Sequence, residues 1–151
     1  MLRLASHDIV FQEIPGEVTL ALNISGCPNR CKGCHSPHLM EDVGEILDES
    51  LLSGLLYEYG NAVTCVCFMG GDADPGMVGQ LAAYVHVYAD GKLKTGWYSG
   101  KDNLPDGCCL GNFDYIKLGP YIERLGGLGS ETTNQRLYKV EEGRLVKFTK
   151  V

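Results

Sequence analysis

Residues 62–85 read AVTCVCFMGGDADPGMVGQLAAYV and contain the signals of a strand, a turn and a helix. The run Ala62–Met69 is short, apolar and rich in β-branched residues, which predicts a buried strand. It stops at a Gly-Gly-Asp turn, after which Asp74 can cap a helix that has Pro75 at its first position. Apolar residues then recur at helical spacing. The stretch therefore predicts a βα unit, from which parallel sheets are built.

Similar signals occur on both sides of this unit. We expect strands at Glu17–Ser25, Leu93–Ser99 and Phe113–Leu118, a helix between Asp48 and Gly60, and a hairpin of Arg136–Val140 and Arg144–Phe148 around a Glu-Glu-Gly turn. Strands that alternate with helices favour a parallel sheet, in which ligands bind beyond the carboxyl ends of the strands. If the first two predicted strands are neighbours, the segments that follow them lie side by side.

Composition excludes several classes of protein. The 151 residues suit one domain, 1–151, and are too few for a complete eight-stranded α/β barrel, which needs at least about 200. Lys and Arg number 13 against 19 Asp and Glu, a net charge of −6, so we expect no nucleic-acid partner. No apolar run is long enough to cross a membrane, and the first residues lack the pattern of a signal peptide. We therefore expect a cytoplasmic protein with no membrane partner.

Three cysteines follow the first predicted strand at the spacing Cys27-x3-Cys31-x2-Cys34. Thiolates this close together in a turn-rich loop are typical ligands of an iron–sulfur cluster. Three ligands on a four-iron cluster leave one iron open, and an open position can bind a substrate. Arg30 and Lys32 would offset part of the thiolate charge.

Other interpretations of the cysteines remain open. A structural zinc site would take His35 or His38 as its fourth ligand, although zinc modules normally show two separated ligand pairs. A redox role or an unrelated thiol is a further alternative. Cys65 and Cys67 share one face of a predicted strand and are expected in the core. The adjacent pair at residues 108 and 109 offers too few ligands for a second metal site.

The C-x3-C-x2-C loop resembles the signature of the radical S-adenosylmethionine (SAM) enzymes. The fuller stretch SGCPNRCKGCHSPHL, residues 25–39, resembles the anaerobic ribonucleoside-triphosphate reductase activating proteins, which are activases of glycyl-radical enzymes. The turn Gly70-Gly71-Asp72 is similar to the family's Gly-Gly-Glu. GSETTNQR, residues 129–136, is similar to a Gly-Ser-Ser-Asn-Gln-Arg element, with extra residues at 131–133. The resemblance covers residues 9–140.

This resemblance implies a 4Fe-4S cluster held by Cys27, Cys31 and Cys34, with SAM on the open iron. Reduction of the cluster would cleave SAM to methionine and a 5′-deoxyadenosyl radical, which removes hydrogen from a backbone glycine. The implied partners are the large subunit of an anaerobic ribonucleotide reductase and a reduced flavodoxin- or ferredoxin-type electron donor. We expect an α/β fold, an incomplete TIM-type barrel of roughly four to six mainly parallel strands with flanking helices and a small C-terminal hairpin.

Residues at the predicted strand ends are the candidates for SAM contacts. Gly70 and Gly71 have no Cβ, so their backbone can approach a ligand closely, and Asp72 can pair with the SAM ammonium group. Tyr98 and Ser99 end the third predicted strand and are candidates for the ribose or adenine. The alternatives are a plain strand-to-helix turn and a polar strand end. Weaker candidates for a SAM or partner contact are Asp114, Lys117 and Arg136, where a structural ion pair is the alternative for Asp114 and Lys117.

The alternatives for the function come from two classes. Within enzymes, they are activation of a different glycyl-radical enzyme and a radical reaction on a small molecule. Outside enzymes, the alternative is a non-catalytic zinc or iron–sulfur binding module. Such a module has a closed metal site, so it would neither bind nor cleave SAM.

Overall fold

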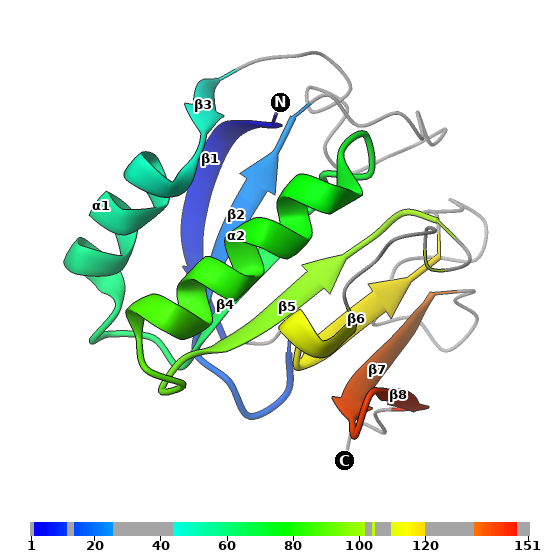
Figure 1. The fold of residues 1–151 in the computed structure, drawn as a ribbon. Helices are drawn as coiled ribbons and strands as arrows, with labels where there is room; N and C mark the ends of the chain where they lie inside the picture. The colour runs from blue at the N-terminus through cyan, green and yellow to red at the C-terminus, as the bar shows by residue number, and fades with distance from the viewer. Residues whose placement is uncertain are drawn as a thin grey trace.

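The computed structural model describes residues 2–11, 14–25, 44–101, 104, 110–119 and 135–147. The strands in these ranges form a single mixed sheet in the order β3-β1-β2-β4-β5-β6-β7-β8 (Figure 1). The strands are β1 (Leu2–Val10), β2 (Thr19–Ile24), β3 (Glu45–Leu47), β4 (Cys65–Met69), β5 (Lys94–Tyr98), β6 (Tyr115–Leu118), β7 (Arg136–Glu141) and β8 (Arg144–Lys147). The helices are α1 (Glu49–Tyr59), α2 (Pro75–Tyr88) and the short 3-10 helix η2 (Leu110–Asn112).

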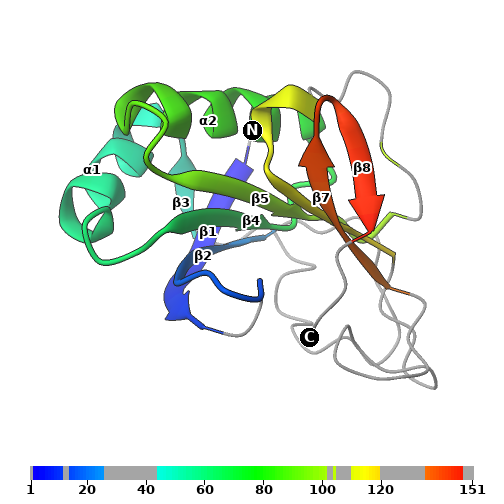
Figure 2. The ribbon, with the colours of Figure 1, turned by 90° about the horizontal axis from the view of Figure 1, so that it is seen from below.

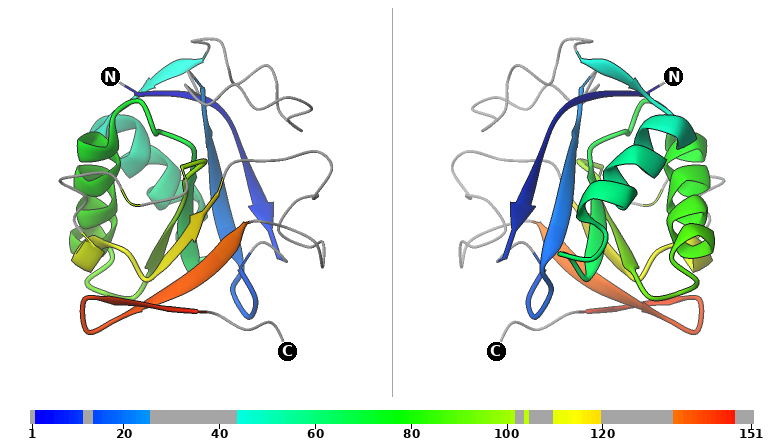
Figure 3. Two further views of the ribbon diagram at one scale, coloured as in Figure 1. Left: turned by 90° about the vertical axis from the view of Figure 1, so that its right-hand side faces the viewer. Right: turned by 90° about the vertical axis from the view of Figure 1, so that its left-hand side faces the viewer.

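The centre of the sheet is parallel and both sides are antiparallel. β2, β4, β5 and β6 run in the same direction, whereas β1 and β3 join antiparallel at one side and β7 and β8 at the other. Both α-helices cover the same face of the sheet (Figure 2), and the sheet curves around them (Figure 3).

The predicted incomplete TIM-type barrel with flanking helices is therefore wrong. In such a barrel each parallel strand is followed by a helix that packs outside it. Among the described residues only β4 is followed by an α-helix that leads straight to its parallel neighbour, β5. The path from β2 to β4 adds the edge strand β3 before α1, and the described part of the path from β5 to β6 holds only η2. The sheet stays open, with β3 and β8 at its edges.

Both predicted helices are confirmed together with their caps. The carboxylate of Asp48 accepts a hydrogen bond from the backbone N–H of Leu51 at 2.9 Å, and that of Asp74 from Met77 at 3.3 Å. Each bond satisfies one of the N–H groups that a helix start leaves without an intrahelical partner. Pro75 occupies the first turn of α2, as predicted. Neither α-helix has the length and apolar character that a membrane crossing requires.

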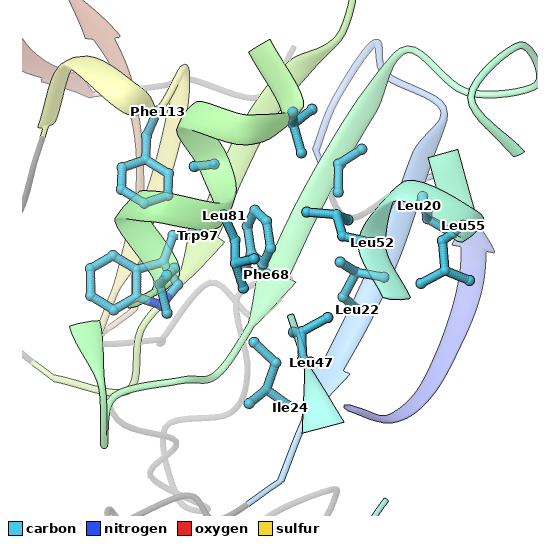
Figure 4. Packing of buried hydrophobic residues seen from close by; sticks show 14 of the residues in the cluster. Leu20, Leu22, Ile24, Leu47, Leu52, Leu55, Phe68, Leu81, Trp97 and Phe113 are labelled. Carbon is cyan, nitrogen blue, oxygen red and sulfur yellow. The ribbon is translucent and has the colours of Figure 1, made fainter. Parts of the chain in front are cut away.

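The main core lies between the helices and the sheet (Figure 4). Phe68, Leu81 and Trp97 are fully buried there, and each side chain of this kind contributes roughly 1.5–3 kcal/mol through burial. A smaller cluster on the opposite face contains Cys65 and Cys67, which are both fully buried and outside any disulfide bond. Burial raises the pKa of the Cys65 thiol, so it stays protonated. The interpretation of these two cysteines as core residues is confirmed.

Candidate functional site

The carboxyl ends of the four parallel strands meet at one edge of the sheet, toward the upper right of Figure 1. Binding sites in such sheets form at this edge because the chain leaves the strands there in turns that can hold ligands. We call this edge the strand-end rim. Its described residues are Ser25, Gly70–Asp72, Tyr98–Lys101 and Lys117–Gly119.

Cys27, Cys31 and Cys34 lie outside the described residues, but both ends of the segment that carries them are described. The backbone N–H of Ser25 donates to the carbonyl oxygen of Arg3 at 3.0 Å. The guanidinium of Arg3 donates to the carbonyl oxygen of Gly44 at 3.1 Å. One residue of β1 therefore holds the chain on both sides of the cysteines, at the rim end of the sheet.

The Gly-Gly-Asp turn lies directly against the end of β2. Gly70 and Gly71 have φ angles of +107° and +87°, a conformation that favours glycine. A Cβ at Gly70 would lie 3.1 Å from the carbonyl oxygen of Ile24, and one at Gly71 would lie 2.6 Å from Cγ2 of Val78. The two glycines thus let the turn pack against β2 and α2. The residue before the cysteine segment and the Gly-Gly-Asp turn are neighbours, because β2 and β4 pair in parallel.

Trp97 fixes the orientation of this turn. Its indole N–H donates to the carbonyl oxygen of Gly70 at 2.7 Å, while the Gly70 N–H donates to the carbonyl oxygen of Tyr98 at 3.0 Å. The Trp97 ring is fully buried and stacks on Phe113 with 5.6 Å between centroids. The sequence alone did not indicate this contact of Trp97. The available signal was its N–H group, which needs an acceptor when it is buried.

Asp72 and Ser99, two of the predicted SAM contacts, bond to each other. Oδ1 of Asp72 accepts from the Ser99 hydroxyl at 2.5 Å, and Oδ2 accepts from the Gly100 N–H at 2.8 Å. Ser99 is fully buried, and its hydroxyl oxygen accepts from the Lys101 N–H at 3.1 Å. The carboxylate therefore joins the turn after β4 to the turn after β5.

Tyr98 and Lys117 face the other side of the sheet from the helices. They are paired neighbours on β5 and β6, and the Lys117 ammonium lies 5.6 Å from the centroid of the Tyr98 ring. That ammonium also donates to the carbonyl oxygen of Gly119 at 3.1 Å, which accepts from the side chain of Gln135 as well. An aromatic ring can stack on a base, and the ammonium beside it can attract an anion.

Asp114 does not reach the rim, because it precedes β6 at the other end of that strand. Its Oδ2 atom accepts from the backbone N–H of Thr95 at 2.9 Å and lies 3.2 Å from Nε2 of His86. These contacts favour the structural interpretation of Asp114. Arg136 begins β7 beside Leu118 and does lie near the rim.

Several other candidates lie outside the described residues. They are His35, His38, the cysteines at 108 and 109, and residues 129–134 of the GSETTNQR element. No protein-family model, curated protein or solved structure matches this chain. The chemistry of the site is therefore argued from its own residues.

Proposed function

We propose that the protein is a radical SAM activase that installs a glycyl radical on an anaerobic ribonucleoside-triphosphate reductase. The observation that carries this proposal is the contact between the end of β2, where the cysteine segment begins, and the Gly70–Gly71 turn. The chain enters the cysteine segment from the end of β2, beside the Gly-Gly-Asp turn, and these two motifs together resemble the family. The strand-end rim is where sheets of this kind bind ligands.

The residues of the chain suit an iron–sulfur cluster. Cys27, Cys31 and Cys34 would hold it, because closely spaced thiolates are the ligands that these clusters use. Arg3 fixes both ends of their segment, so less chain entropy is lost when the three thiolates converge on one centre. When bound, the cluster and SAM supply one-electron cleavage of a carbon–sulfur bond and a radical that removes hydrogen from carbon.

The protein's own part is to bind and orient. The half-buried Tyr98 ring would offer a surface for an adenine base, and the Lys117 ammonium, on a residue only 8% exposed, would attract a carboxylate. The Gly70 carbonyl is held by Trp97, so the turn beside the end of β2 keeps one orientation. Groups that are fixed before the ligand arrives lose little entropy when it binds.

The first test is to reconstitute the purified protein with iron and sulfide without oxygen. We expect a broad brown absorbance that bleaches on reduction, and release of 5′-deoxyadenosine when SAM is added to the reduced protein. Cys31→Ala should abolish that release, because it removes a cluster ligand. Cys67→Ala is the matched control, since this thiol is buried in the sheet, and it should retain both properties.

Two outcomes would contradict the proposal. A colourless protein that retains zinc would identify a structural metal module instead. Normal cleavage of SAM by Cys31→Ala would show that the assigned ligands are wrong. If SAM is cleaved but the reductase is not activated, the radical chemistry stands and the partner is a different one.

A further inference from the structure

The carboxylate of Asp72 is engaged by the segment that follows β5. Its two oxygens accept hydrogen bonds from the Ser99 hydroxyl at 2.5 Å and from the Gly100 N–H at 2.8 Å. Hydrogen bonds to a charged acceptor are shorter and stronger than those between neutral groups. Asp72 is therefore fixed in one orientation by a part of the chain 27 and 28 residues away.

Ser99 depends on this carboxylate. Its hydroxyl is fully buried, donates to Asp72 and accepts from the Lys101 N–H at 3.1 Å. A buried hydroxyl that loses its partner is costly, since no water replaces the lost bond. Residues 99–101 thus take their conformation from contacts that begin at Asp72.

The same segment connects Asp72 to β6. The Ser99 N–H donates to the carbonyl oxygen of Lys117 at 2.9 Å, and the Gly119 N–H donates to the carbonyl oxygen of Lys101 at 2.7 Å. The carbonyl oxygen of Gly119 in turn accepts from the Lys117 ammonium at 3.1 Å. An unbroken series of hydrogen bonds therefore links the turn after β4 to the cation at the rim.

We propose that Asp72 is a positioning residue of the rim, which holds residues 99–101 and, through them, Lys117 in the arrangement that binds SAM. Its carboxylate does not take up the SAM ammonium group itself. The identity of the ligand rests on the proposed function, but the hydrogen-bond network does not. The length of Asp72 places its two oxygens on Ser99 and Gly100, and we expect an added methylene to disturb this match.

The network is tested by amide hydrogen exchange on the protein without cluster or SAM. Asp72→Ala and Asp72→Glu should each raise the exchange rate of the Gly100 N–H roughly tenfold or more, as expected for the loss of a hydrogen bond to a charged group. Emission from Trp97, the one tryptophan of the chain, should shift as well, because its indole bonds to the adjoining turn. Asp74→Asn is the control: asparagine caps helices as well as aspartate does, so exchange at Gly100 should not change.

Unchanged exchange at Gly100 in Asp72→Glu would overturn the proposal. If Asp72→Ala does not fold, Ser99→Ala can be used instead, because it removes the hydrogen bond between Ser99 and Asp72 by deleting the donor. It should also raise the exchange rates of the Gly100 and Lys101 N–H groups. Normal exchange in Ser99→Ala would equally count against the network.

The link to the ligand is tested by SAM binding to the reconstituted protein. Asp72→Ala and Ser99→Ala should weaken binding by similar factors, and the double variant should be no weaker than either single variant, because both act through one network. If Asp72→Ala weakens binding while Ser99→Ala does not, or if Asp72→Glu binds SAM normally, Asp72 is a direct ligand and the proposal fails. If the wild type binds no SAM, the proposed function fails, and the exchange rates still decide the network.

Discussion

Glu17 lies just before β2 and accepts hydrogen bonds from residues in or next to the three parallel strands β4, β5 and β6. It is 8% exposed and accepts hydrogen bonds from Thr64 at 2.8 Å, Tyr115 at 2.8 Å and Lys94 at 3.1 Å. Burial alone would raise the pKa of this carboxyl, but the three hydrogen bonds outweigh burial and hold the pKa below its ordinary value of 4.5. Burial and the bond to Glu17 also raise the pKa of Tyr115 to about 12. The native state therefore contains Glu17 as a carboxylate.

This carboxylate predicts a defined loss of stability in acid. Because its pKa is lower in the folded chain than in the unfolded chain, the unfolded state binds more protons as the pH falls below 4.5. The stability that Glu17 contributes is complete above that pH and is lost as the pH falls through the lowered folded pKa. Glu17→Gln should cost about 1–3 kcal/mol at neutral pH, and its difference from the wild type should shrink in acid.

Urea unfolding followed by circular dichroism, from neutral pH to about pH 3, measures both effects. Tyr115→Phe is the matched variant, because it removes one hydrogen bond and keeps the carboxylate. It should cost about 1 kcal/mol and retain the dependence on acid. A difference between Glu17→Gln and the wild type that stays constant down to pH 3 would refute this account.

Among single residues, the sequence predicted those features that depend only on residues close together in the chain. The Gly-Gly-Asp turn and both helix caps are local patterns. The bond between Asp72 and Ser99 is not local, since it joins residues 27 positions apart. Nothing near either residue indicates the other, so the sequence could not predict this hydrogen bond. The interaction of Trp97 with Gly70 was missed for the same reason.

The C-terminal hairpin gives the sharpest prediction at the scale of elements. In the hairpin of β7 and β8, Glu141 pairs with Arg144. This pairing leaves a loop of two residues, Glu142 and Gly143. Their φ angles are +51° and +74°, as a type I′ turn requires. Glutamate adopts this conformation at a cost of about 1–2 kcal/mol, whereas asparagine tolerates it. Glu142→Asn should therefore stabilise the protein by about 0.5–1 kcal/mol and raise Tm by roughly 1–4 °C.

Thermal unfolding measures this change, with Glu142→Gln as the control for charge. Glutamine removes the same negative charge but lacks asparagine's tolerance of a positive φ, so we expect little change. An equal gain in both variants would mean that charge, and not backbone conformation, limits the hairpin.

Most helices and strands were predicted because their signals are contiguous. The two helices and the strands β2, β4, β5 and β6 correspond to runs with clear periodicity or strong β character, and the hairpin to a turn between two such runs. β1 and β3 were missed. β1 has the polar residues Ser6, His7 and Asp8 at its centre, all exposed, and β3 has only three residues. Both become strands by pairing with neighbours rather than by their own composition.

At the scale of the whole molecule, the order of strands and helices was insufficient to predict the architecture. The predicted barrel had four to six mainly parallel strands, each continuing around a barrel, with a small C-terminal hairpin. Direction of pairing is a long-range property, and β1 and β7 both join antiparallel. These strands turn the parallel centre into an open mixed sheet whose edges, β3 and β8, are short. Short edge strands limit unwanted pairing between molecules, so a sheet of this kind can leave its edges unpaired.

The open sheet bears on the partner that the proposed function requires. Both described helices pack on one face of the sheet (Figure 3), whereas Tyr98 and Lys117 lie on the other face. An enzyme that removes hydrogen from the backbone of another protein must let that chain approach its bound substrate. We therefore expect the reconstituted, reduced protein to produce a glycine-centred radical when SAM and the large subunit of an anaerobic ribonucleoside-triphosphate reductase are added.

Electron paramagnetic resonance measures this radical directly. Omission of SAM, or use of Cys31→Ala, should abolish the signal, because each removes one component of the proposed chemistry. Asp72→Glu should give a weaker signal in proportion to its weaker SAM binding, since the positioning role acts before the radical forms. A full signal from Cys31→Ala would contradict the ligand assignment. Release of 5′-deoxyadenosine without a glycine radical would assign the protein to a different glycyl-radical partner or to a small-molecule substrate, because the cleavage of SAM and the choice of hydrogen donor are separate steps.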